Sequence, residues 1–282
     1  VMGFIPYEGV SNVKFVKYAF DILQRDCKKI SQGTAQDNLS WKKLSTIKFP
    51  APDIEIQDKI VSILSVYDDL IENNQKQIKL LEEAAQRLYK EWFVDLRFPG
   101  YEDVAVIDGV PEGWKKTKVT DFLEVKYGKD HKALADGNIP VYGSGGVMRY
   151  VKPILYSGES VLIPRKGSLN NILLVSGDFW TIDTMFFSIP KLENVAKYTY
   201  LFLKGLDMYS FNIGAAVPSM TVKILEGIDI LHPTDTVLEQ FERITSPIFE
   251  MKTILERQIK EAEQARDRRL PTLMSGEIEV QQ

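Results

Sequence analysis

The sequence of 282 residues predicts a mixed α/β protein in which an α/β domain is joined to two long helices. Residues 56–94 carry apolar side chains at steps that alternate between three and four, which is the spacing of a coiled-coil seam. A second segment, from residue 241 to 265, repeats this pattern. Between the two, short β-prone runs alternate with turns rich in Gly, Asn and Ser, as in a compact α/β domain.

The first long helix contains neither Pro nor Gly over residues 56–94, and at about 1.5 Å per residue it would extend about 58 Å. A helix of that length has no use inside one small domain, so we expect further structure at each end. Its predicted seam consists of Ile60, Ile63, Tyr67, Leu70, Asn74, Gln77, Leu81, Ala84 and Leu88.

The long helix is part of an internal repeat. A shift of 181 residues places Gly33 to Arg87 on Gly214 to Arg268 without a gap, and the run Gln77-Ile78-Lys79 recurs as Gln258-Ile259-Lys260. Such a repeat determines the architecture. A Gln at equivalent seam positions in both copies suggests a polar residue that sets the register. The second seam is predicted at Phe241, Ile244, Ile248, Met251, Leu255, Gln258, Ala262 and Ala265.

Residues 1–52 repeat the end of the globular domain rather than a whole domain. Asn12 to Phe20 resembles Asn194 to Phe202 at a shift of 182, and nothing in the first copy corresponds to residues 111–183. We therefore expect residues 1–52 to be the C-terminal remnant of a first domain. A fragment, a split or permuted gene, and a half-protein that pairs with a second chain all remain open as explanations.

The remaining boundaries follow from breaks in the patterns. We expect the first helix over 53–97, a turn-rich linker over 98–113, the complete domain over 114–233, the second helix over 234–269 and a tail over 270–282. Pro271 is expected to end the second helix, because proline lacks the backbone N–H and its ring clashes with the preceding turn. Within the domain, strands are predicted at 140–142, 160–163, 172–175 and 184–187, and a helix at 194–204.

Composition excludes several classes of protein. The single cysteine, Cys27, excludes a disulfide framework and a cysteine metal site. No apolar run is long enough to cross a membrane and no signal peptide is evident, so we expect a soluble cytoplasmic protein. The charge is divided: residues 114–179 contain ten Lys or Arg and six Asp or Glu, whereas residues 53–103 contain six and twelve. The domain is therefore basic and the first helix acidic.

Three loops of the domain carry candidate chemistry. The run Arg165 to Asn171 combines Arg and Asn, which can read base edges, with Lys and Ser, which suit phosphates; a solvated hairpin turn explains it equally well. Lys126 to Lys132 interleaves basic and aromatic residues, as DNA-facing or ordinary charged loops do. Tyr142 to Gly146 lacks the P-loop lysine and fits a tight turn better than a phosphate cradle.

No catalytic constellation is evident. The two histidines, His131 and His232, belong to no cluster with metal-ligand spacing, and no nucleophile lies in a recognisable triad pattern. The carboxylates that follow Pro52 fit a solvated helix face better than a nuclease site.

Five segments in this order resemble the DNA-specificity subunits of Type I restriction-modification enzymes. They span the chain from residue 111 onward, and the repeated helix adds residues 33–94. The segments are Pro111 to Lys115, Gly137 to Gly146, Ile163 to Ser168, Gly214 to Met220, and Leu270 to Ile278.

The resemblance implies two target-recognition domains held apart by two long antiparallel helices. In that family each domain reads one half of a split DNA site in the major groove, and the helices set the spacing and dock two methyltransferase subunits. A separate restriction subunit translocates and cleaves. The resemblance therefore implies a non-catalytic chain that binds no cofactor itself, with S-adenosylmethionine expected in the methyltransferase partner. With one complete domain, the chain alone would read one half-site, and self-pairing of two chains would present two identical domains.

The basic and polar loop residues of the complete domain are the predicted contacts to double-stranded DNA. Two other functions are compatible with parts of the sequence. A nuclease with a coiled-coil dimerisation arm would need a carboxylate cluster that the domain lacks, and a structural adaptor leaves the Arg165 loop without a role. The predicted contacts are Lys129, His131, Lys132, Ser144, Arg149, Arg165, Lys166, Ser168, Asn170 and Asn171.

Overall fold

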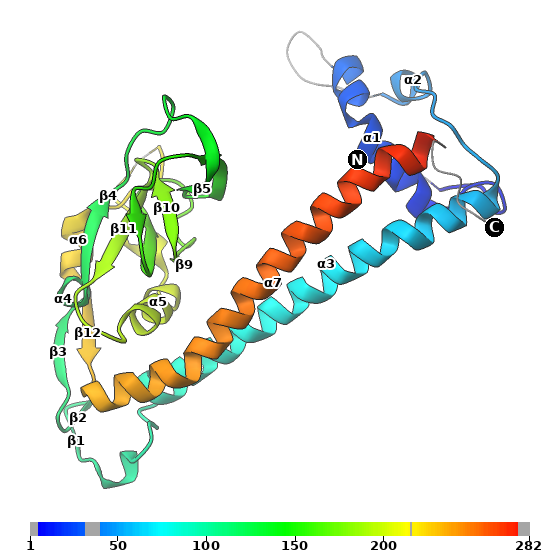
Figure 1. The fold of residues 1–282 in the computed structure, drawn as a ribbon. Coiled ribbons are helices and arrows are strands. Elements are labelled where there is room, and N and C mark those ends of the chain that lie inside the picture. The colour runs from blue at the N-terminus through cyan, green and yellow to red at the C-terminus, as the bar shows by residue number, and fades with distance from the viewer. Residues whose placement is uncertain (1–4, 32–39, 215, 276–282) are drawn as a thin grey trace. The chain divides into compact units, whose positions relative to one another are not determined.

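The computed structural model describes residues 5–31, 40–214 and 216–275 (Figure 1). The chain divides into two compact units. The first, the helical unit, comprises Val1–Leu80 and Met251–Gln282, and the second, the mixed unit, comprises Leu81–Glu250. Predictions that concern residues 1–4, 32–39, 215 and 276–282 lie outside the described residues.

The mixed unit contains two four-stranded sheets. Its pairs are antiparallel except for β10 and β5, which are parallel. In the first sheet the strand order is β6 (Gly146–Val151), β5 (Asp136–Gly143), β10 (Asp178–Thr181) and β7 (Tyr156–Ser157). In the second sheet the order is β4 (Leu123–Tyr127), β11 (Met185–Pro190), β8 (Ser160–Pro164) and β9 (Leu173–Val175).

The four predicted strands are confirmed as parts of β5, β8, β9 and β11. The predicted helix is α5 (Ala196–Lys204). Strands β4, β6, β7 and β10 were not predicted. Nor were two short helices, α4 (Val119–Phe122) and α6 (Val222–Gly227), or the antiparallel pair β3 (Lys115–Lys118) and β12 (Asp229–His232). The segment predicted as a linker contains the turn η2 (Tyr101–Asp103) and a small hairpin of β1 (Val106–Ile107) and β2 (Val110–Pro111).

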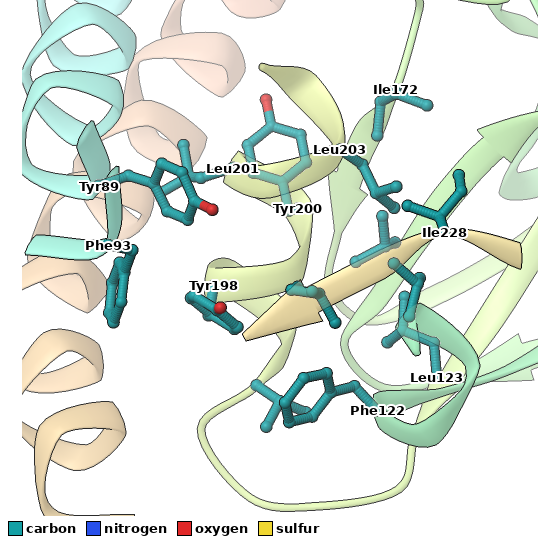
Figure 2. Packing of buried hydrophobic residues seen from close by; sticks show 14 of the residues in the cluster. Tyr89, Phe93, Phe122, Leu123, Ile172, Tyr198, Tyr200, Leu201, Leu203 and Ile228 are labelled. Atoms are coloured by element: carbon teal, nitrogen blue, oxygen red, sulfur yellow. The ribbon is translucent and has the colours of Figure 1, made fainter. Parts of the chain in front are cut away.

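Helix α5 lies in the middle of the main core of the mixed unit. Figure 2 shows Tyr198 between Phe93, which comes from the π-helical turn η1 (Lys90–Val94), and Phe122 of α4. The Phe93 and Tyr198 ring centroids are 4.6 Å apart in an edge-on arrangement. This geometry stabilises the pair in addition to the stabilisation that comes from burying the two rings. The Tyr198 hydroxyl donates to the Leu231 carbonyl at 2.6 Å, so its one polar group is satisfied inside the core.

A buried ion cluster joins α5 to the second long helix within the mixed unit. The Lys197 ammonium lies 2.8 Å from Glu159 and 2.5 Å from Glu242, and its side chain is only 8% exposed. Burial alone would lower the pKa of Lys197, but the hydrogen bonds to both carboxylates raise it above its usual value. The lysine is therefore held in its charged form.

The two long helices are α3 (Ile54–Tyr89) and α7 (Asp235–Ser275). Within the helical unit, Asn74 donates to the Gln258 side chain at 3.0 Å, and Arg266 donates to Asp68 at 2.9 Å. Asp68 precedes Asn74 on α3, whereas its partner Arg266 follows Gln258 on α7. The two helices are therefore antiparallel, as predicted. The first predicted helix changes form near its end: Lys90–Val94 is a π-helical turn, and it buries Trp92 and Phe93.

The predicted seam is correct at every second position. At the positions between them, the residue that follows the predicted one is the more buried of the two. Ile60, Asn74, Phe241 and Leu255 are buried. Leu70, which is 41% exposed, gives way to the buried Ile71, and Ile244 gives way to the buried Thr245. Leu64 and Ala85 are buried in place of Ile63 and Ala84, and Ala262 is buried as predicted. The partly buried predicted positions are Tyr67, Leu81, Leu88, Ile248 and Ala265. Met251, Gln77 and Gln258 are exposed, so the two glutamines are not the paired polar seam positions that were predicted; Gln258 instead accepts from the buried Asn74.

The expected helix end at Pro271 is wrong, because α7 continues to Ser275. Leu270, Leu273 and Met274 of this last turn are buried against Phe15 and Tyr18. Proline removes one backbone hydrogen bond from a helix interior. Burying three large apolar side chains contributes several kcal/mol, at roughly 1.5–3 kcal/mol each, and so outweighs that loss.

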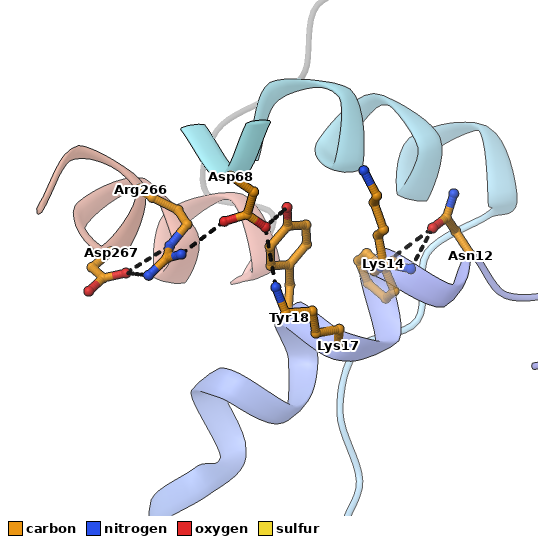
Figure 3. Close-up of polar contacts among 8 residues, drawn as sticks. Asn12, Lys14, Lys17, Tyr18, Asp68, Arg266 and Asp267 are labelled. Carbon is orange, nitrogen blue, oxygen red and sulfur yellow. Dashed lines mark hydrogen bonds and ion pairs between the residues drawn. The ribbon is translucent and has the colours of Figure 1, made fainter. Parts of the chain in front are cut away.

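The helical unit is completed by α1 (Val13–Ser31) and α2 (Trp41–Leu44). Asn12 caps α1, because its side-chain oxygen accepts from the backbone N–H groups of Lys14 at 2.8 Å and Phe15 at 3.3 Å. Figure 3 shows Asp68 between Tyr18 and Arg266. Burial alone would raise the pKa of Asp68, but these two hydrogen bonds lower it, so the carboxylate stays charged.

Among the described helices, none is both long enough and apolar enough to cross a membrane.

Candidate nucleic-acid interface

The strand pairing of the mixed unit gathers several loops at one edge of the two sheets. Because β10 and β5 are parallel, Thr181 at the end of β10 lies beside Tyr142, the penultimate residue of β5. The loop after β4 joins them, since the Lys129 N–H donates to the Thr181 carbonyl at 2.8 Å. The end of β8 is paired with the start of β11, at Pro164 and Met185.

We call this edge the rim and define it as residues 127–132, 143–146, 165–171 and 181–184. It contains most of the predicted DNA contacts, although these are up to 42 positions apart between Lys129 and Asn171. The predicted tight turn is confirmed, because Gly143 pairs with Gly146 across the β5–β6 turn. The rim therefore brings three separately predicted loops together.

Arg165 is held in place at the rim. Its guanidinium donates to the Asp183 carbonyl at 3.0 Å and lies 5.5 Å from the centre of the Tyr127 ring. Its own N–H donates to the Thr184 carbonyl, and its carbonyl accepts from the Met220 N–H. An arginine fork stacked on an aromatic ring loses little side-chain entropy when it binds a base edge or a phosphate.

Three lysines of the rim present free charge. Lys129, Lys132 and Lys166 are exposed, and none forms a salt bridge with the residues that the structure describes. Ser168 is exposed beside them. Flexible, solvated ammonium groups of this kind suit phosphate oxygens, which need charge rather than fixed geometry.

Other predicted contacts hold the loops themselves. Arg149 donates to the Asp136 carboxylate at 2.6 Å and to the carbonyls of Leu134 and His131, so it fixes the 131–136 loop. Asn171 donates to the Ser144 carbonyl at 2.8 Å and thereby ties two rim loops together. Asn170 is placed differently, because its oxygen accepts from the Met208 N–H and its amide donates to Asp207.

A neighbouring segment that the predictions missed packs against the rim. The Tyr209 hydroxyl donates to the Gly167 carbonyl, the Gly167 N–H donates to Pro218, and Lys166 forms a bridge with Ser219. Gly167 has φ +88°, and a Cβ there would lie 2.9 Å from the Ser144 hydroxyl, so glycine is required. Gly214 to Met220 was recognised as a family-like segment, and that signal could have placed it at the rim.

No group of three or more His, Cys, Asp or Glu that could hold a metal ion occurs in the described part of the chain.

Comparisons with known proteins agree with one another. The family profile described as "Type I restriction modification DNA specificity domain" matches residues 1–83 and 111–264. The Type I restriction enzyme MjaIX specificity subunit of Methanocaldococcus jannaschii is 27% identical, over 99% of this chain and 72% of that protein. The HindI specificity subunit of Haemophilus influenzae is 21% identical, over 85% and 71% of the two chains.

The fold also matches a solved structure. The crystal structure of the S subunit of a Type I restriction-modification system from M. genitalium superposes with a TM-score of 0.59 at 18% identity, and the match covers 94% of this chain and 73% of that chain. At this identity the match shows a shared fold.

Proposed function

Because the chain belongs to the Type I restriction-modification DNA specificity family and so acts in DNA recognition, we propose that its mixed unit reads one half of a bipartite DNA site through the rim. The observation that supports this most directly is the fixed guanidinium of Arg165 beside three unpaired lysines. The arginine is suited to a guanine edge, and the lysines to the backbone on either side.

The charge distribution supports a division of labour between domain and helices. The basic segment 114–179 contains three of the four rim loops, all but 181–184, whereas the acidic segment 53–103 contains α3. An acidic helix repels DNA and favours a protein partner. In this proposal the long helices dock two methyltransferase subunits, and a separate restriction subunit completes the assembly.

The chain itself is non-catalytic in this proposal and binds no cofactor. The methyltransferase subunits bind S-adenosylmethionine and transfer the methyl group. Residues 1–52 are the C-terminal part of a first recognition domain, because α2 lies at the repeat position of α6, and Leu44 is buried as its counterpart Leu225 is.

The decisive test is the Arg165→Ala variant, assayed as DNA methylation by the complex with its methyltransferase on a panel of single-base variants of the site. We expect the variant to lose about 1–3 kcal/mol of binding and to relax discrimination at one base pair, because a bidentate contact is removed. Arg97→Ala is the matched control, since Arg97 is exposed and lies outside the rim.

Lys166→Ala should behave differently in the same assay. It should weaken all sequences alike and reduce the slope of log affinity against log salt by about one. Unchanged DNA recognition by the Arg165→Ala, Lys166→Ala double variant would contradict the proposal and favour a structural adaptor.

A further inference from the structure

An apolar groove of about 950 Å³ lies within the mixed unit, away from the rim. Its floor is formed by aromatic and aliphatic side chains from the end of α3, from α5 and from β12, among them Phe93, Tyr198, Phe202 and Ile230. Val94 stands at its edge with 59% of its surface exposed. Val94 therefore offers exposed apolar surface beside a groove whose lining is mainly apolar, as interaction sites often do.

The same groove recurs at the equivalent place in the other copy of the repeat. A smaller cavity of about 200 Å³ in the helical unit is lined by Val16, Phe20, Leu23 and Phe49. With the shifts of 182 and 181, these positions correspond to Tyr198, Phe202, Gly205 and Ile230, all of which line the larger groove. The recurrence at four positions argues against an accidental packing defect.

One repeat position distinguishes the two grooves. Where the smaller cavity has Leu23, the larger groove has Gly205, and the missing side chain leaves room on its floor. A Cβ at Gly205 would lie 3.3 Å from the flexible amide end of Gln86, so the fold would tolerate a side chain there. Glycine at this position therefore keeps the groove open.

The charges around the larger groove are unbalanced. Lys90 and Asp229 also line it, but they are neutralised by Asp95 and Lys118, and Glu83 already has a partner. Arg87 and Lys116 line the groove and form no ion pair with the part of the chain that the structure describes. The edge of the groove therefore carries two unpaired positive charges, which are complementary to carboxylates.

We propose that this groove docks a segment of a protein partner that inserts large apolar side chains and places carboxylates against Arg87 and Lys116. The inference rests on the proposed function for the identity of the partner, the methyltransferase subunit. The groove supplies an apolar pocket for anchoring side chains, and the two cations fix the orientation of the segment.

The test measures the affinity of the full chain for the purified methyltransferase subunit. Gly205→Leu fills the floor with the residue that the other copy carries, and Arg87→Glu with Lys116→Glu reverses the free charge. We expect each change to weaken binding at least tenfold and to leave DNA binding by the chain unchanged. Lys223→Glu, on the exposed face of α6, is the matched control and should bind within twofold of the unchanged chain.

Hydrogen exchange over residues 81–250 verifies that each variant is folded. A photoreactive phenylalanine analogue at Phe202 should cross-link to a partner peptide that contains large apolar residues next to Asp or Glu. Full affinity in folded Gly205→Leu and charge-reversal variants would overturn this inference alone. No binding of the unchanged chain to the methyltransferase subunit would overturn the proposed docking function and this inference with it.

Discussion

Helices α1 and α5 repeat one sequence pattern, yet they are buried to different degrees. In α1, Phe15, Tyr18 and Ala19 are buried on one face, while Lys14 and Lys17 face solvent. In α5 all residues are buried except Phe202, which is partly buried, and the exposed Lys204. The difference arises because α5 is enclosed by a sheet, α4 and the long helices, whereas α1 packs on the long helices and on the short segment around α2 and Phe49.

The comparison shows that positions buried in α1 are also buried in α5, but that the side chains at these positions can differ in chemistry. Phe15 and Lys197 occupy the same repeat position. Phe15 is buried among apolar side chains, whereas Lys197 is buried between two carboxylates. A helix such as α5, which is packed on both sides, can bury a charged side chain only where neighbouring elements supply groups of opposite charge.

The largest expected effect is that of Lys197→Met, which breaks this comparison. The change leaves Glu159 and Glu242 without their cation, so we expect a loss of about 3 kcal/mol in the free energy of unfolding of the mixed unit. Glu159 is one-third exposed, which places the effect at the low end of the range for buried pairs. Local unfolding measured by hydrogen exchange gives this value, with Lys223→Met as the control.

A stable Lys197→Met variant would show that the cluster is solvated rather than buried. Adding Glu159→Gln and Glu242→Gln should recover much of the loss, because no uncompensated charge then remains.

An intermediate effect is expected in the coiled-coil seam, where Ile71→Ala and Leu70→Ala form a matched pair. Ile71 is 8% exposed and Leu70 is 41% exposed. Ile71→Ala should therefore cost about 2–4 kcal/mol, and Leu70→Ala less than about 1 kcal/mol. Urea denaturation followed by helical circular dichroism distinguishes them. The reverse order would restore the register that was first predicted.

The smallest effects are expected at Asn12 and Asn194, which also share a repeat position. Asn12→Ala should cost about 1 kcal/mol, because the cap of α1 is lost. Asn194 has φ +59°, so Asn194→Ala should cost about as much through backbone strain. Glycine separates the two causes: Asn194→Gly should be nearly neutral, while Asn12→Gly also loses the bond to Asp58. Hydrogen exchange near each site measures both, and equal effects of glycine would contradict this assignment.

The sequence was enough to predict the spacing of apolar residues along the two long helices. It was not enough to predict which of two adjacent apolar residues faces the partner helix. The spacing of three and four identified both long helices, but Ile63 and Leu64, like Leu70 and Ile71, are both apolar. Only the facing helix decides which of each pair is buried. On α7 the buried residue is Thr245, whose hydroxyl bonds the Phe241 carbonyl, so hydrophobicity alone points to the wrong neighbour.

The candidate site could be predicted as loops more readily than as individual side chains. The chemistry of Arg165 and Lys166 indicated the correct loop. Whether an arginine faces outward depends on which loop folds back over it, and Arg149 is occupied by residues 131–136. Tyr127 was assigned to a charged loop, and its place under Arg165 follows only from the pairing of β4 with β11.

The two stretches that form the helical unit have a consequence for how the protein is made. Phe15 and Tyr18 emerge from the ribosome early, but Leu270 and Met274, which bury them, are added later by on the order of ten to fifty seconds at about 5–20 residues per second. The mixed unit is continuous in sequence and lacks this delay. We therefore expect proteolysis of nascent chains stalled when residue 250, but not residue 270, has left the ribosome to cut the first 80 residues and spare the mixed unit; equal protection of both would contradict this order. Until then Phe15 and Tyr18 lack the side chains of α7 that bury them.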